Sequence, residues 1–189
     1  MRRLRVALIL SAVCCLISAC VVRSVYPWFP DNTKVTDISL FGVWHDENID
    51  MTTFFTSGKE SKYNVLVISD KKEQTKFTAS LHRLNKTLFL VVGPEDRNDM
   101  GVVATLPGYL LFRVEFRNDG MKLFVLDLES FGDRIKGKEI KILYDGDENK
   151  GYVLFSPTEH LTAFVRSQLD DQTFFDEEPM YSFKKVTRK

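Results

Sequence analysis

The sequence YLLFRVEFRNDGMKLFVLDL, residues 109–128, carries the clearest structural pattern in the chain. Apolar and polar residues alternate through its two halves, which are joined by Asp119-Gly120, a pair typical of a type I′ hairpin turn. Pairing across this turn places Phe116 opposite Leu123 and makes one face of the hairpin apolar. The other face also carries Phe124 and nearby leucines, so we expect a further element to cover it.

The same period of two continues on both sides of this hairpin. Turn-forming residues such as Ser57-Gly58 separate the alternating runs. Residues 87–92 are apolar throughout, which is typical of a strand covered on both faces. In chain order, we expect strands at residues 40–44, 51–56, 61–69, 75–84, 87–92, 109–118, 121–128, 140–144, 152–155 and 180–186.

An amphipathic helix is predicted near the C-terminus. Ser156-Pro157-Thr158-Glu159 has the form of a capping box with proline at the first helical position. Apolar residues then recur at helical spacing from Leu161 to Leu169, and this stripe needs a partner. We expect the helix to pack on the Phe124 side of the sheet. A shorter helical turn is predicted at residues 129–135.

These elements predict a mainly β domain with one or two helices. Sequential strands favour antiparallel pairing between neighbours. The fold class is therefore an antiparallel up-and-down barrel or a strongly curved sheet, with the C-terminal amphipathic helix packed outside. Local pattern does not separate the closed barrel from the open sheet.

Gly42-Val43-Trp44, at the start of the first predicted strand, resembles the Gly-x-Trp that opens lipocalins and their calycin relatives. In that family a run of strands is followed by a helix and a final strand, so the resemblance implies a lipocalin-like fold. The sequence lacks the other short lipocalin signatures and has no clear arginine to pack over Trp44. The chain also resembles a group of bacterial lipoproteins without an established activity, through Tyr63-x-Val65, Phe77-x-Ala79-x-Leu81, Leu88-Phe89-Leu90 and the helix with Leu161 and Phe164.

The first twenty residues have the form of an export signal. Three arginines precede an apolar run from Val6 to Ile17, as in secretory signal peptides. This run is shorter than the ~20 residues of a transmembrane helix, which is the alternative interpretation. Leu16-Ile17-Ser18-Ala19-Cys20 resembles the bacterial lipobox, which implies cleavage before Cys20 and acyl chains on that cysteine.

The lipobox divides the chain into a signal peptide (1–19), a lipidated cysteine with a tether (20–37) and a single β-rich domain (38–189). Two or more acyl chains hold a protein stably on a membrane, so the implied partner is a lipid bilayer. Val21 in place of aspartate after the cysteine implies the outer membrane of a bacterial cell envelope. Within the tether, Tyr26, Trp28 and Phe29 either sit at the headgroup level or fold back onto the domain.

Composition sets further limits. Cleavage would leave 170 of the 189 residues, with Cys20 as the remaining cysteine, so burial or a partner must stabilise the domain without disulfides. Loss of the three arginines leaves 23 basic against 26 acidic residues, a net charge of −3. This balance does not favour nucleic acid as a partner. We predict no cofactor.

Two groups of potential metal ligands have simpler explanations. His45-Asp46-Glu47 are adjacent residues, which rarely converge on one ion, so we expect a solvated loop. Residues 145–151 have the oxygen spacing of a calcium loop, but Lys150 stands where the EF-hand glycine belongs, which favours a polar hairpin loop. His82 shares a predicted strand face with polar residues, and we expect it at the surface.

An enzyme is the weakest of three functional classes, since no local hydrolase motif is present. Its carboxylates would come from Asp127 or from Glu95, Asp96 and Asp99 in the link 93–108. A link of this length is typical of a lid or binding loop, or of an unstructured connection.

Two stronger functions remain. In one, inward-facing side chains line a cavity that carries a lipid or another small apolar molecule. In the other, they fill the barrel, and the lipoprotein is a structural or interaction module with an envelope protein as its partner. Large aromatic side chains readily fill a small barrel, which favours the interaction module. The candidate pocket residues are Phe77, Phe89, Phe112, Val114 and Phe116.

Overall fold

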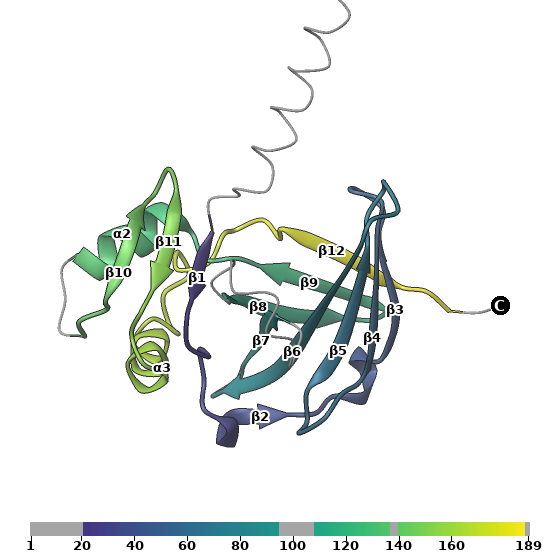
Figure 1. The fold of residues 1–189 in the computed structure, drawn as a ribbon, viewed down its shortest axis with the longest axis horizontal. Helices are drawn as coiled ribbons and strands as arrows, with labels where there is room; N and C mark the ends of the chain where they lie inside the picture. The colour runs from purple at the N-terminus through teal and green to yellow at the C-terminus, as the bar shows by residue number, and fades with distance from the viewer. Residues whose placement is uncertain (1–20, 95–107, 137–139, 188–189) are drawn as a thin grey trace, which may run out of the picture.

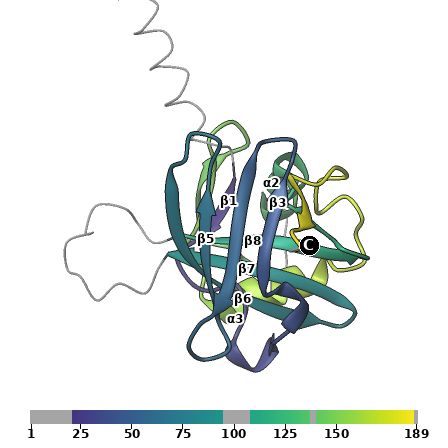
Figure 2. The same ribbon diagram turned by 90° about the vertical axis from the view of Figure 1, so that its right-hand side faces the viewer.

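The computed structural model describes residues 21–94, 108–136 and 140–187. Its centre is a closed barrel of eight antiparallel strands (Figures 1 and 2). The strands are β3 (Gly42–Asp46), β4 (Met51–Ser57), β5 (Tyr63–Ile68), β6 (Gln74–Leu84), β7 (Thr87–Pro94), β8 (Tyr109–Arg117), β9 (Gly120–Phe124) and β12 (Tyr181–Lys185).

The last strand closes the barrel. On β12, Tyr181 pairs with Leu123 of β9, and Lys184 pairs with His45 of β3. The strands from β3 to β9 pair in chain order, and β12 lies between the last and the first of them. The predicted mainly β fold is therefore confirmed, and it is a closed barrel rather than an open curved sheet.

The hairpin of β8 and β9 differs from the predicted one in register. Its loop is Asn118-Asp119 rather than Asp119-Gly120, and Val114 instead of Phe116 lies opposite Leu123. Asn118 takes the left-handed backbone of this loop, with a φ of 52°, and asparagine tolerates that conformation. Because the register moves by two residues, each side chain still lies on its predicted face.

Two apolar clusters lie on the two faces of the barrel wall. Leu90 on β7 belongs to the interior cluster, whereas Phe89 and Val91 belong to the outer cluster. All three are at most 3 % exposed, which confirms that this strand is covered on both faces. Trp44 and Phe116 belong to the interior cluster, and their rings are in contact.

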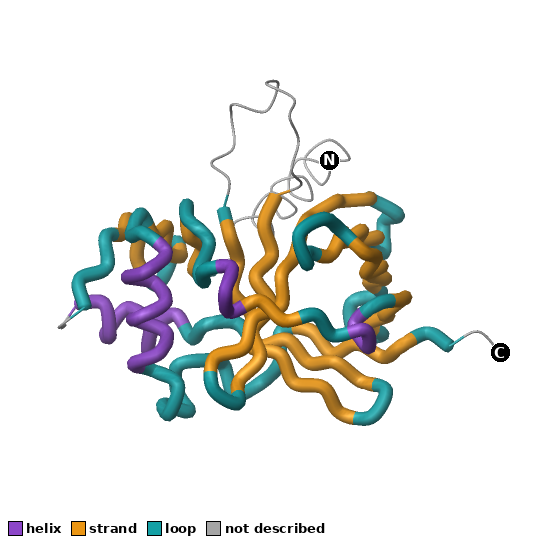
Figure 3. Tube along the Cα trace, turned by 90° about the horizontal axis from the view of Figure 1, so that it is seen from below, coloured by secondary structure: helices purple, strands orange, loops and turns teal. Residues whose placement is uncertain are grey.

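A layer of two helices and a small hairpin covers the outer cluster on one side of the barrel (Figure 3). Leu161 and Phe164 of the C-terminal helix are buried in the same cluster as Phe124, so the predicted docking is confirmed. The layer consists of α2 (Leu128–Lys136), β10 (Tyr144–Asp147), β11 (Gly151–Leu154) and α3 (Thr158–Ser167).

The predicted capping box does not form. Pro157 precedes α3, and its side chain makes no capping hydrogen bond. Ser156 is fully buried, and its Oγ accepts a hydrogen bond from the Leu143 backbone N–H at 2.7 Å. From within α3, Thr162 Oγ1 donates to the Trp28 carbonyl at 3.0 Å, which ties the helix to the N-terminal segment.

That N-terminal segment packs onto the barrel and its helical layer over the described part of residues 20–37. β1 (Val22–Ser24) pairs antiparallel with β8 and parallel with β11. Trp28 and Phe29 are buried, and Trp28 Nε1 donates to the Tyr109 carbonyl at 2.9 Å. These two rings fold back onto the domain. The remaining short elements are η1 (Asp31–Thr33), β2 (Lys34–Val35), which pairs with β6, and η2 (Ile38–Leu40).

Candidate functional site

One edge of β8 is divided between two partner strands, and this division opens the barrel wall. Tyr109 and Leu110 pair with β1, whereas residues from Arg113 onward pair with β9. In the described part of the chain, no strand pairs with Leu111 or Phe112 on this edge. β1 and β9 therefore lie apart along this edge of β8, and a space is left between β1 and β9.

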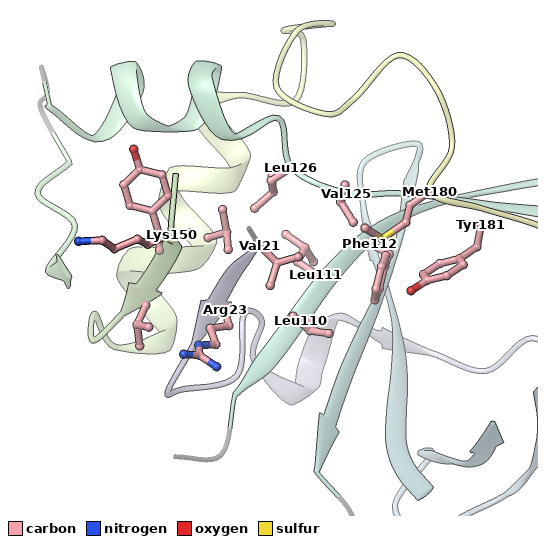
Figure 4. A pocket seen from close by; sticks show the side chains of 14 residues that line it. Val21, Arg23, Leu110, Leu111, Phe112, Val125, Leu126, Lys150, Met180 and Tyr181 are labelled. Atoms are coloured by element: carbon pink, nitrogen blue, oxygen red, sulfur yellow. The ribbon is translucent and has the colours of Figure 1, made fainter. Parts of the chain in front are cut away.

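A pocket of about 290 Å³ occupies this space, and we call it the seam pocket. Its volume is near the lower end of the range for small-molecule sites, and most of its walls are aliphatic or aromatic. In Figure 4 the charged ends of Arg23 and Lys150 point away from the apolar side chains. The lining residues are Val21, Val22, Arg23, Leu110, Leu111, Phe112, Val125, Leu126, Lys150, Gly151, Tyr152, Val153, Met180 and Tyr181.

The barrel side of the seam pocket is made by two aromatic rings. Phe112 from β8 and Tyr181 from β12 have their ring centroids 6.1 Å apart and lie beside one another in Figure 4. Burial raises the pKa of Tyr181, and the negative charge of Asp46 raises it further. The phenol is therefore neutral at pH 7, and this wall carries no charge of its own.

The opposite side of the pocket depends on a close backbone approach. Gly151 has a φ of 77°, and a Cβ at this position would lie 2.5 Å from the Val21 carbonyl oxygen. That same oxygen accepts a hydrogen bond from the Tyr152 backbone N–H at 3.1 Å. Glycine therefore permits both the backbone conformation and the approach of β11 to Val21.

The structure separates the five side chains that were predicted to line a pocket. Phe112 lines the seam pocket, while Phe77, Val114 and Phe116 pack in the interior cluster. The inward placement of Phe89 is wrong, because it packs in the outer cluster with its ring 5.9 Å from Phe175. A strand that is apolar on both faces offers no alternation from which to tell inside from outside.

Two polar groups expected in solvent are buried instead. His82 is 2 % exposed and Asp46 is 1 % exposed. The Asp46 carboxylate accepts a hydrogen bond from the Ser182 backbone N–H at 2.6 Å and so helps to hold the closing strand β12. The loop predicted at residues 145–151 is shorter in the structure: Asp145, Gly146 and Asp147 pair within β10, Gly151 begins β11, and only residues 148–150 connect the two strands.

Of the carboxylates considered for catalysis, the structure describes only Asp127, and that residue has a structural role. Asp127 accepts a hydrogen bond from the Ser130 backbone N–H at 2.7 Å, in the first turn of α2. It lies close to Asp176, whose pKa is raised by burial and then by the charge of Asp127. Glu95, Asp96 and Asp99 lie outside the described residues, as does Cys20.

Comparison with known proteins gives no match, whether with family models, with curated proteins or with solved structures. Among residues 21–94, 108–136 and 140–187, no helix has the length and apolar character needed to cross a membrane. Over the same ranges, no three side chains of the metal-binding types gather at one point. The candidate site is therefore argued from the geometry of the seam pocket.

Proposed function

We propose that this protein is a bacterial envelope lipoprotein, held on the membrane by acyl chains on Cys20, which binds an apolar molecule in the seam pocket. One observation carries the proposal: Val21, the residue that follows Cys20, lines an apolar pocket. Consecutive Cα atoms are ~3.8 Å apart, so the pocket would lie within a few ångströms of the anchor. A lipid acyl chain, or a molecule of similar shape and polarity, fits this chemistry.

A kinship with lipocalins and other calycins is part of the proposal. The eight-strand antiparallel barrel is compatible with it. Trp44 of the Gly-x-Trp motif is buried, and Lys185 from the last strand lies over its indole ring, 5.2 Å from the centroid. Lys185 thus packs over Trp44, where the sequence provides no clear arginine. We place the ligand at the seam rather than at the barrel centre, because aromatic rings occupy the centre.

The test is native mass spectrometry of the full-length protein purified from bacterial membranes, followed by solvent extraction and lipid analysis. The proposal predicts acylation at Cys20 and a bound apolar molecule at a stoichiometry near one. A Val125→Trp variant, which fills the seam pocket, should lose the bound molecule and keep the acylation. Bare protein from both preparations would exclude the carrier function, and absence of acyl chains on Cys20 would exclude the anchor.

A second candidate function, an interaction module on the envelope, is favoured by an exposed apolar patch. Leu143, Tyr144 and Phe155 are 53, 38 and 41 % exposed. The Phe155 backbone N–H donates to the Leu143 carbonyl at 2.8 Å, so these side chains lie at one end of β10, which forms the edge of the sheet. An unprotected strand edge with apolar side chains favours protein contacts.

A photo-crosslinking residue at Leu143 tests this second function in living bacteria. The interaction module predicts a crosslinked envelope protein that is absent when the same residue replaces Glu159, which lies on the exposed side of α3. Identical crosslinking patterns at the two positions would exclude a specific partner at this edge.

A further inference from the structure

A chain of polar groups crosses the outer face of β6, and none of its members lines the seam pocket. Ser80 Oγ lies 2.8 Å from Nε2 of His82, and Thr33 Oγ1 lies 2.8 Å from Nδ1 of the same ring. Thr33 Oγ1 in turn donates a hydrogen bond to the Pro30 carbonyl at 2.8 Å. The two ring nitrogens are thus held between two hydroxyl groups.

The direction of the protons in this chain follows from counting donors. A threonine hydroxyl has one proton, and that of Thr33 is directed to the Pro30 carbonyl. On this basis we assign the proton between Thr33 and His82 to Nδ1. In the neutral ring this leaves Nε2 as an acceptor, so the Ser80 hydroxyl donates its proton to the imidazole.

The ring is neutral at pH 7. The pKa of His82 is lowered to about 4, mainly by burial and also by the positive charge of Lys34, while Asp31 acts in the opposite direction. The imidazole is 2 % exposed and packs against Phe29, with ring centroids 5.2 Å apart. Nε2 is therefore available as a base above this pKa and is fixed in orientation.

The serine faces a pocket of its own. A cavity of about 140 Å³ is lined by Ser80, His82, Lys34, Thr78 and Tyr109, among others. The Lys34 side chain is 11 % exposed, and its ammonium lies 2.7 Å from Asp31. A nearly buried cation in the lining of the same cavity can stabilise negative charge that develops on an oxygen atom there.

We propose that Ser80 is the nucleophile of an ester-cleaving site, with His82 as the general base and Thr33 as the residue that positions the imidazole. This arrangement has the order nucleophile, base and orienting group that acyl-transfer sites require. The size of the cavity favours a small ester or a short acyl group. The site is separate from the seam pocket, and the inference stands independently of the function proposed above.

The chemical step follows from the proton directions. Ser80 Oγ attacks the carbonyl carbon of the ester while its proton moves to Nε2 of His82. The tetrahedral oxyanion then collapses, the ester C–O bond breaks, and the departing alcohol takes the proton from Nε2. Water, activated by the same nitrogen, attacks the acyl-serine and releases the carboxylic acid, which restores the Ser80 hydroxyl.

The experiment uses the full-length protein in detergent with a fluorophosphonate probe and with p-nitrophenyl acetate. We expect the probe on Ser80 by peptide mass spectrometry, and a burst of nitrophenolate near one equivalent. Ser80→Ala should lose both signals, whereas Ser182→Ala on β12 should keep both. A folded wild-type protein that is neither labelled at Ser80 nor more active than Ser80→Ala would overturn the proposal.

Two further variants test the base and its positioning. His82→Gln should slow labelling of Ser80 by about 100-fold or more, in line with the usual contribution of a general base. Because this change is buried, Thr33→Val provides a second test that leaves Ser80 and His82 in place. It should slow labelling at unchanged fold by circular dichroism, and Thr33→Ser should restore it. Labelling at the wild-type rate in folded Thr33→Val protein would overturn the assigned roles.

Discussion

Trp44 on β3 and Phe116 on β8 meet inside the barrel with ring centroids 6.5 Å apart, although β12 and β9 separate their strands in the wall. Phe112 and Tyr181 make a second contact between non-neighbouring strands. Side chains of non-neighbouring strands therefore touch inside the barrel, as in small barrels whose interior is filled by packing. The seam pocket instead lies in the barrel wall, at the point where β1 and β9 diverge.

Removing the larger ring should reveal this packing. Trp44→Ala is expected to lower the free energy of unfolding by about 3–5 kcal/mol, because the buried indole leaves a cavity that its neighbours cannot fill. Urea denaturation followed by circular dichroism measures the change. Ile38→Ala, at a position 79 % exposed, serves as control and should stay within about 0.5 kcal/mol. A similar small loss for Trp44→Ala would mean that the interior is not packed in this way.

Gly151→Ala tests the backbone approach at the seam. An alanine Cβ would collide with the Val21 carbonyl oxygen at a positive φ, so we expect a loss of more than about 1 kcal/mol and fraying of β1 from β11. Gly108→Ala is the matched control, since its Cβ would meet the flexible side chain of Arg23 at 3.3 Å. Hydrogen exchange at the Tyr152 amide should rise in the first variant and stay unchanged in the second.

The free energy of unfolding should decrease as the pH is lowered, because His82 is buried. Its pKa is about 4 in the folded protein and 6.5 in the unfolded chain. The unfolded state therefore binds more protons between these values, and the free energy of unfolding drops by about 3 kcal/mol as the pH falls from 6.5 to 4. Urea titrations at intervals of half a pH unit measure this slope.

His82→Gln is the control for the pH dependence, and it should flatten the curve in this window. Arg134 holds the pKa of Asp171 at about 2, so that group contributes above its ordinary value of 3.8 and is lost only as the pH falls toward 2. Its effect thus lies below the window of His82. A slope between pH 6.5 and 4 that persists in the variant would assign the effect to other groups.

The alternation of apolar side chains was enough to predict the eight strands of the barrel and the docking of α3, because each of these strands has a recognisable apolar face. Phe89 and Leu90 mark the limit of that signal, since a strand covered on both faces looks the same in either orientation. The burial of His82 comes from Phe29 and Thr33, which reach it from a segment far away in sequence. Ser156 formed no cap because it bonds to Leu143 instead.

The seam pocket was missed for a similar reason. The pocket arises where β8 changes partner from β1 to β9. No local sequence pattern indicates that the segment before residue 38 contains a strand of the sheet. Trp28 and Phe29 were the available signal. Two large rings beside prolines suit a segment that folds back onto a core, and this was one of two open interpretations.

The most direct test of the central claim is a titration of the full-length protein with dansyl-undecanoic acid, followed by fluorescence in a detergent that does not compete for the probe. The account predicts saturable binding to the wild-type protein and to Val186→Trp, at an exposed position that follows β12 and does not line the seam pocket. Val125→Trp, in the seam pocket, should bind at least tenfold more weakly at unchanged thermal stability. Equal affinity in all three proteins would contradict the assignment of the seam pocket as a binding site for apolar molecules.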